Sequence, residues 1–197
     1  MGALIRAALV AGAFASAPAQ ASPVDRWRNF IEQGSVRFGI PARWIEQVMA
    51  AESGGLPVVN GRPIRSRAGA MGLMQLMPAT WATMRARLKL GDNPDDPADN
   101  ILAGAGFLRL MYDRFGYPGL FAAYNAGPGS YARAKANGSP LPAETQAYLV
   151  SVTRGIVTQD RPARPTLFAL RHEGAGAEGA SAAPPRSSLF AVQRSLP

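Results

Sequence analysis

The sequence predicts a mostly α-helical protein with one folded domain. In several segments apolar residues recur three and four positions apart, which is the spacing of one helix face. No segment shows sustained alternation of apolar and polar residues, so no extended sheet is expected. The chain has 197 residues and is 47% hydrophobic, which favours one domain with a sizeable core plus tails. We place the domain at residues 22–158.

The first half of this domain should contain two helices and a loop. Helical spacing of apolar residues predicts a first helix over residues 24–34. A second helix over residues 41–52 begins at a proline, which suits a first helical position, and the pair Gly54 and Gly55 ends it. Residues 56–68 contain two prolines and an Asn-Gly pair, and they predict a loop.

The second half should be helical apart from an acidic, turn-rich segment at residues 91–97. Its clearest helix runs from residue 97 or 98 to residue 115. The side chains expected to face the core from that helix are Ile101, Leu102, Ala105, Leu108 and Met111 or Tyr112. The other expected elements are a helix at 78–90, a short helix at 120–125, a helical turn at 131–136 and a last helix at 144–157.

Both ends of the chain differ in composition from this domain. Residues 1–21 have the pattern of a secretory signal peptide, with Arg6, a short apolar run and a small-x-small cleavage site at residues 19–21. A buried core helix or a membrane anchor is the alternative, but the run is short for a bilayer span. We expect export and a periplasmic location. Residues 159–197 are rich in Pro, Ala, Gly, Ser and Arg, and we expect a disordered tail.

Composition excludes several chemistries. The chain has no Cys, which rules out a Cys nucleophile and a thiolate metal site. Its one histidine, His172, lies in the tail, so a Ser-His-Asp triad is not expected. The formal net charge of +8 invites a nucleic-acid interpretation. The arginines are scattered, however, and we expect no nucleic-acid partner. An anionic surface such as a bacterial envelope suits the charge better, and solubility alone is the alternative.

Glu52 is the candidate catalytic residue. Ile45, Val48, Met49 and Glu52 fall at i, i+3, i+4 and i+7, so the carboxyl is the polar end of an apolar stripe. Burial disfavours the charged form and raises the pKa of a carboxyl, as a general acid near neutral pH requires. The alternative is that Glu52 turns outward at the helix end or pairs with an arginine.

A nearly uncharged segment, residues 66–78, follows this helix. Its glycines and alanines allow close backbone packing and unusual dihedral angles. Gln75 lies among Leu and Met residues, where an amide needs a partner. That partner is either a sugar or the loop backbone. Met77 is either a sugar contact or core.

Five motifs in order resemble those of family 1 lytic transglycosylases, the soluble lytic transglycosylase (SLT) type, whose fold is related to goose-type lysozyme. The resemblance covers about residues 38–156. The motifs are AESG at 51–54, GAMGLMQLMP at 69–78, NILAGAGFL at 100–108, AYNAGPG at 123–129 and PAETQAY at 142–148.

The resemblance implies cleavage of the β-1,4 bond between N-acetylmuramic acid and N-acetylglucosamine in peptidoglycan, leaving 1,6-anhydro ends. Glu52 matches the single catalytic acid/base, and no metal or organic cofactor is required. The positions that match contacts to the glycan strand are Ser66, Gln75, Met77, Tyr124, Asn125 and Glu144. The small size resembles relatives attached to secretion or conjugation complexes, and we expect a monomer.

Several of these contacts have structural alternatives. Tyr124 can pack under a Gly-rich turn, Asn125 can cap that turn, and Glu144 can make a structural hydrogen bond at the start of the last helix. Ser66 is the least secure match, because the stretch between Ser53 and Ser66 is longer than in the shortest family members and carries arginines.

Ordinary glycosidases use two carboxylates, and here one obvious acid lies in the motif region. The aspartates of the turn at 91–97 and Asp99 are expected to face solvent and cap the next helix. With one acid, the acetamido group of the substrate would assist. A lysozyme-type hydrolase on the same fold, or a non-catalytic wall-binding assembly factor, is the alternative function.

Overall fold

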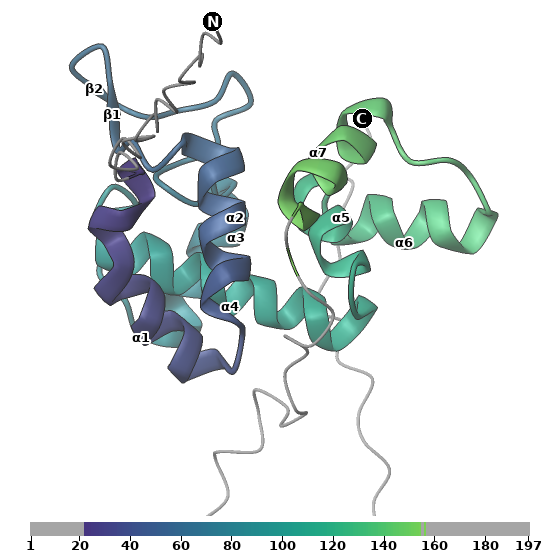
Figure 1. Ribbon diagram of the computed structural model, residues 1–197, viewed down its shortest axis with the longest axis horizontal. Helices are drawn as coiled ribbons and strands as arrows, with labels where there is room; N and C mark the ends of the chain where they lie inside the picture. Colours follow the sequence, from purple (N-terminus) through teal and green to yellow (C-terminus); the bar gives the residue numbers. More distant parts are fainter. Residues whose placement is uncertain (1–21, 155, 157–197) are drawn as a thin grey trace, which may run out of the picture.

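The computed structural model describes residues 22–154 and residue 156, and these form a helical domain (Figure 1). The prediction of a mostly α, lysozyme-like domain is confirmed. A 3-10 turn, η1 (Pro23–Trp27), leads into α1 (Arg28–Phe38), which is followed by α2 (Ala42–Ser53) and a hairpin of β1 (Val58–Val59) and β2 (Arg62–Pro63). The remaining helices are α3 (Pro78–Leu88), α4 (Pro97–Phe115), α5 (Gly119–Ala126), α6 (Pro128–Asn137) and α7 (Ala143–Thr153).

Helix α4 is the central element of the domain. It packs against α1 and α3 and against α5, and α7 packs against both α5 and α2. In Figure 1, α1 to α3 and the hairpin lie to one side, α5 to α7 lie to the other, and α4 runs beneath both. Four of its predicted inward side chains are at most 1% exposed, namely Ile101, Ala105, Leu108 and Met111. Leu102 and Tyr112 pack against the same core and are partly buried.

The acidic cap predicted before α4 is confirmed. Asp96 is the residue that precedes the helix, and its side chain accepts a hydrogen bond from the backbone N–H of Asp99 at 3.0 Å. Asp99 in turn accepts from the backbone N–H of Gly91 at 2.8 Å. The two carboxylates satisfy backbone donors at the turn, as expected for a helix N-terminus.

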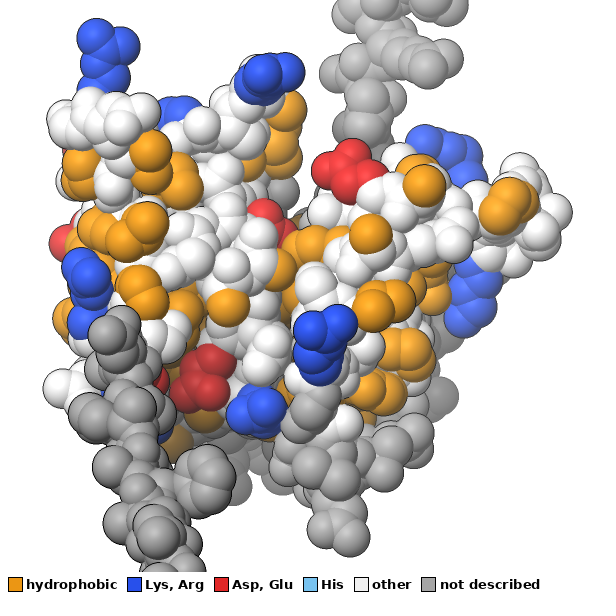
Figure 2. Space-filling view, turned by 45° about the horizontal axis from the view of Figure 1, so that its top comes forward, with side chains coloured by type: hydrophobic (Ala, Val, Ile, Leu, Met, Phe, Trp, Pro, Cys, Tyr) orange, Lys and Arg blue, Asp and Glu red, His pale blue; other side chains and the backbone are white. Residues whose placement is uncertain are grey.

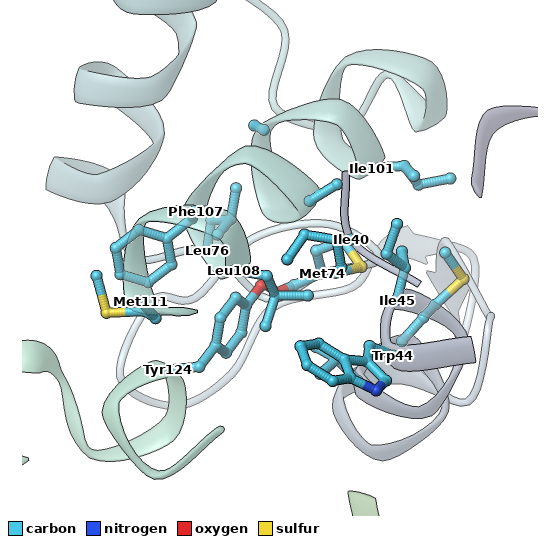
Figure 3. Close-up of a cluster of buried hydrophobic side chains, with 14 of the residues drawn as sticks. Ile40, Trp44, Ile45, Met74, Leu76, Ile101, Phe107, Leu108, Met111 and Tyr124 are labelled. Carbon is cyan, nitrogen blue, oxygen red and sulfur yellow. The ribbon is translucent and has the colours of Figure 1, made fainter. Parts of the chain in front are cut away.

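The loop after the hairpin contributes to the hydrophobic core. Figure 3 shows Met74 among Ile40, Ile45 and Leu108, with the ring of Tyr124 alongside. Met74 is fully buried, although it belongs to no helix or strand. A loop that supplies a core side chain is held in one position, which matters for the polar residues beside it.

The first helix differs from its prediction at both ends. Its start is a 3-10 turn, and α1 continues past Gly34 to Phe38. Gly34 is buried inside the helix, where a Cβ would lie 3.0 Å from the Cβ of Ala105. This glycine therefore permits α1 and α4 to approach closely and does not end the helix. The actual end is at Gly39, whose φ of 58° is left-handed.

The segment predicted as a loop, residues 56–68, contains the β-hairpin. Val58 pairs with Pro63 and Val59 pairs with Arg62 in antiparallel register. Asn60 and Gly61 form its turn with φ of 52° and 73°, which are the left-handed values that a two-residue hairpin turn requires.

Three other boundaries also differ. Helix α3 ends at Leu88 because Lys89 takes a left-handed φ of 56°, and α6 begins already at Pro128. Helix α7 ends at Thr153, where Arg154 leaves the helical region with ψ of 117°. The predicted signal peptide at 1–21 and the predicted tail at 159–197 lie outside the described residues. Among the helices that are described, none has the length and apolar content needed to cross a membrane.

Candidate active site

Glu52 lies in the last turn of α2, as the spacing predicted. Ile45, Val48 and Met49 on the same face are fully buried, and Glu52 itself is half-buried. Gly54 ends the helix with φ of 61°. The carboxyl thus sits where an apolar stripe meets the surface, and no ion pair to an arginine is present among the described residues.

The surroundings of Glu52 favour its protonated form. The pKa of this carboxyl is raised to about 7, mainly by burial and to a smaller extent by the negative charge of Glu144 on α7. The hydroxyl of Tyr148, also on α7, opposes the rise. That hydroxyl is buried and interacts with the carboxyl, but it makes no hydrogen bond of ordinary geometry to a described residue. A carboxyl with this pKa can donate a proton near neutral pH.

The segment from Ser66 to Met77 forms a tight loop beside the end of α2. Ser66 is exposed, and its Oγ accepts a hydrogen bond from the backbone N–H of Ala70 at 3.0 Å. Met71 and Leu76 exchange two backbone hydrogen bonds of 2.9 and 3.0 Å. Ser66 therefore closes the turn that precedes the glutamine, and its side chain remains reachable from solvent.

Gln75 occupies the strained position of this loop. Its φ of 44° is left-handed, and its Nε2 donates to the carbonyl of Gly72 at 2.8 Å. The loop backbone thus satisfies the amide nitrogen, as one of the two predicted alternatives required. The side-chain oxygen has no donor among the described residues, so it stays available to a ligand. A non-glycine residue with positive φ is uncommon and points to a constrained site.

Met77 is 44% exposed and immediately precedes α3. The alternative that it is simple core is therefore wrong. An exposed, flexible thioether at the edge of the loop can contact a ligand.

Three side chains anchor this loop, and of these only Tyr124 was a predicted site residue. Ser53 Oγ donates to the carbonyl of Leu73 at 2.7 Å. Asn100 Oδ1 accepts from the N–H of Met74 at 2.7 Å, while its Nδ2 donates to the carbonyls of Met71 and Pro94. The third anchor is Tyr124, whose hydroxyl donates to the carbonyl of Met74 at 2.7 Å. These bonds link α2, α4 and α5 to the loop.

Tyr124 is thus part of the support of the loop. Its side chain is buried, its ring lies 5.3 Å from that of Phe107, and its hydroxyl is already donated to Met74. Burial raises the pKa of the Tyr124 hydroxyl well above its usual value, and the charge of Glu52 raises it further. The structure therefore brings Tyr124 within electrostatic reach of Glu52 and packs it against Phe107 and the loop at Met74.

Asn125 and Glu144 lie on either side of the α5–α7 contact. Asn125 Oδ1 accepts from the hydroxyl of Thr145 at 2.9 Å, which ties the two helices together. Glu144 is exposed in the first turn of α7, and its charge acts on Glu52. The second carboxylate is therefore remote in sequence but close in space.

The candidate residues come from two parts of the domain. Glu52 and the 66–77 loop belong to the part with α1 to α3, whereas Asn125, Glu144 and Tyr148 belong to the part with α5 to α7. In the space-filling view the surface is indented between these parts, and acidic side chains lie along the indentation (Figure 2). A ligand placed there can reach groups from both parts.

Tyr148 was not among the predicted site residues. The available signal was its place in the PAETQAY motif, four residues after Glu144 and therefore on the same face of α7. Its proximity to Glu52 depends on how α7 packs against α2, which spacing within one helix does not reveal.

Comparison with known proteins gives the family. The model of the "Transglycosylase SLT domain" family matches residues 29–146. A transglycosylase of Enterobacteria phage PRD1 is 37% identical over 91 residues, which is 46% of this chain and 31% of that protein. The soluble lytic murein transglycosylase of Escherichia coli K12 is 41% identical over 73 residues, or 34% of this chain and 11% of that protein. The chain thus matches under half of the length of each relative.

Solved structures agree with this assignment. The 70-kDa soluble lytic transglycosylase in complex with bulgecin A superposes with a TM-score of 0.57 at 26% identity, covering 64% of this chain and 22% of that one. An inactive glutamate-to-glutamine mutant of the lytic transglycosylase Slt from Pseudomonas aeruginosa gives a TM-score of 0.54 at 26% identity and the same coverage. From the family match, the relatives and the shared fold together, we conclude that this chain belongs to the transglycosylase SLT domain family.

Proposed function

We propose that this protein is a peptidoglycan lytic transglycosylase. It cleaves the β-1,4 bond between N-acetylmuramic acid and N-acetylglucosamine and leaves 1,6-anhydro-N-acetylmuramic acid ends. The observation that carries the proposal is Glu52, a half-buried carboxyl whose pKa is raised to about 7 at the end of an apolar helix face. A relative is named a soluble lytic murein transglycosylase, and a structural neighbour of the same class is inactive as a glutamate-to-glutamine mutant.

In this mechanism Glu52 acts first as an acid. It gives its proton to the glycosidic oxygen as the bond from that oxygen to C1 of N-acetylmuramic acid breaks. The acetamido oxygen of the same sugar stabilises the positive charge that develops at C1. The exposed Ser66 hydroxyl and the Gln75 side-chain oxygen would hold the acetamido and hydroxyl groups of that sugar.

Glu52 then acts as a base. Its carboxylate takes the proton of the 6-hydroxyl, whose oxygen forms the new bond to C1 and closes the anhydro ring. No water enters the products, and Glu52 returns to its protonated state. A pKa near 7 suits a group that must release and recover a proton in one cycle.

One observation favours a second candidate, a lysozyme-type muramidase. Glu144 lies close enough to act on the pKa of Glu52, so the site contains a second carboxylate. A hydrolase could use it as the base that activates water. In the transglycosylase, by contrast, Glu144 only tunes the acid and lines the site.

Product analysis separates the two candidates. Purified peptidoglycan is digested with the protein, and the released fragments are measured by mass spectrometry. The transglycosylase leaves muramic acid ends that are one water lighter than reducing ends, and Glu144→Gln retains cleavage. Reducing ends in the wild-type digest, together with loss of cleavage in Glu144→Gln, would establish the muramidase.

The proposed substrate also sets the proposed location and partners. Peptidoglycan glycan strands are the substrate, so we propose that the protein works in the periplasm after removal of residues 1–21. A secretion or conjugation complex that needs a local opening in the wall is the proposed assembly. Co-purification of the tagged full chain with envelope complexes tests this part.

A further inference from the structure

The insertion between the candidate acid and Ser66 is a built structure. We call residues 56–67 the basic hairpin. Its two strands pair in register, the Asn60-Gly61 turn closes it, and the N–H of Ile64 donates to the carbonyl of Pro57 at 3.0 Å. Such a short hairpin is marginal on its own, so its position depends on contacts outside itself.

Arg65 supplies that outside contact. Its guanidinium makes a two-pronged ion pair with Asp95 of the turn before α4, with an Nη2 to Oδ2 distance of 2.7 Å. The hydrogen bonds raise the pKa of the Arg65 guanidinium, and Asp95 itself is positioned by Asn93. A two-pronged arginine–carboxylate pair fixes orientation as well as distance. The basic hairpin is thereby braced against the rest of the domain.

Two other arginines of the basic hairpin have no such role. Arg62 and Arg67 are exposed, and neither makes an ion pair or hydrogen bond with a described residue. Val58 and Val59, which lie between α2 and Arg62 in the sequence, have exposed fractions of 50% and 43%. Figure 2 shows basic side chains standing on the loops that project from this part of the molecule. The braced segment thus presents unpaired positive charge beside exposed apolar side chains.

The basic hairpin is also adjacent to the candidate active site. It begins four residues after Glu52, and Arg67 directly follows Ser66, whose Oγ is part of the loop that carries Gln75. A glycan strand that places N-acetylmuramic acid at this site carries a peptide branch on that sugar. A branch of four or five residues reaches roughly 15 Å when extended, which covers the length of so short a hairpin.

We infer that the basic hairpin is a subsite for the acidic peptide branch of the glycan strand, with Arg62 and Arg67 binding its carboxylates. The inference rests on the proposed function, because it assigns the partner of the same site. Charge complementarity selects this occupant: a peptide branch brings carboxylates, whereas the sugar backbone between branches is uncharged. The exposed Val58 and Val59 would contact its apolar side chains.

The test compares two substrates and two variants. The substrates are glycan strands with their peptides and strands from which an amidase has removed them. The variants are the double substitution Arg62→Gln with Arg67→Gln, and a control with the same loss of charge, Arg133→Gln with Lys135→Gln on the exposed α6. Thermal unfolding checks that both variants are folded.

We expect kcat/KM on peptide-bearing strands to fall three- to tenfold in the hairpin variant, since exposed ion pairs are individually weak. The fall should be at least threefold larger than on peptide-free strands, should shrink at high salt, and should be absent in the control. Equal falls on both substrates, or equal falls in both variants, would overturn the inference while leaving the proposed function intact. If the wild type cleaves neither substrate, the proposed function itself fails.

Discussion

Ser53 Oγ donates a 2.7 Å hydrogen bond to the carbonyl of Leu73, and so the residue next to the candidate acid holds the loop that carries Gln75. The same oxygen also contacts the carbonyl of Met49 and accepts from the N–H of Gly55. The position of Glu52 relative to the proposed sugar-binding loop therefore depends on a buried hydroxyl.

Ser53→Ala should weaken both the fold and the site. It removes the donor to Leu73 and leaves a buried carbonyl unsatisfied, which costs about 1–3 kcal/mol. We expect the free energy of unfolding in urea to fall by that amount and kcat/KM to fall at least tenfold. Ser130→Ala on the exposed start of α6 is the control and should change stability by less than about 0.5 kcal/mol. Unchanged activity in Ser53→Ala would show that this link does not position the acid.

Tyr124→Phe distinguishes support of the loop from contact with substrate. If the hydroxyl serves Met74, as its 2.7 Å hydrogen bond indicates, its loss costs about 1–3 kcal/mol of stability. Tyr131→Phe is the matched control, because that ring packs on Phe115 while its hydroxyl makes no hydrogen bond to a described residue. A raised KM with unchanged stability in Tyr124→Phe would instead assign the hydroxyl to the substrate.

The pH profile should follow the protonation of Glu52. The acid must be protonated to start the reaction, so kcat/KM should be level below about pH 6 and fall about tenfold per pH unit above about 7. Two variants should move this alkaline limb in opposite directions. Glu144→Gln removes a charge that raises the pKa of Glu52, so the limb moves to lower pH. Tyr148→Phe removes a hydroxyl that lowers it, so the limb moves to higher pH. Shifts of the same sign, or none, would contradict this electrostatic assignment.

Glu52→Gln should stabilise the protein at neutral and alkaline pH. The carboxyl titrates near 4.5 in the unfolded chain and near 7 in the fold. Below pH 4.5 both states are protonated and Glu52 has no effect on the balance. Between pH 4.5 and about pH 7, Glu52 ionises in the unfolded chain but stays protonated in the folded protein, so folding becomes less favourable. The loss of stability reaches at most about 3 kcal/mol above pH 7. Urea unfolding of both proteins at pH 4 and pH 8 checks this: the variant should gain stability at pH 8 alone.

The helices could be predicted because their information is local. Apolar spacing placed α2 and α4 within one or two residues, and glycine or proline marked their ends. Gly34 was misread as an end because its purpose is the close approach of α1 to α4, which is a tertiary contact. The hairpin was missed because its strands have two exposed residues each, too few for an alternating pattern. The Asn60-Gly61 pair was nonetheless a usable signal.

The site was predictable to the extent that motifs and helix faces carry it. Glu52 follows from spacing, and Gln75 and Met77 from their motif. The anchoring bonds of Ser53, Asn100 and Tyr124 join residues 20 to 50 positions apart, so no local pattern could show them. The same holds for Tyr148 and Glu144, which reach Glu52 because α7 packs on α2.

The most direct test of the central claim is the peptidoglycan digest repeated with Glu52→Gln. The wild-type protein should release fragments whose muramic acid ends are one water lighter than reducing ends. The variant, folded and at least as stable at pH 8, should release none above the background of untreated wall. Anhydro ends released by Glu52→Gln at the wild-type rate would contradict the account, because the proton would then come from another group.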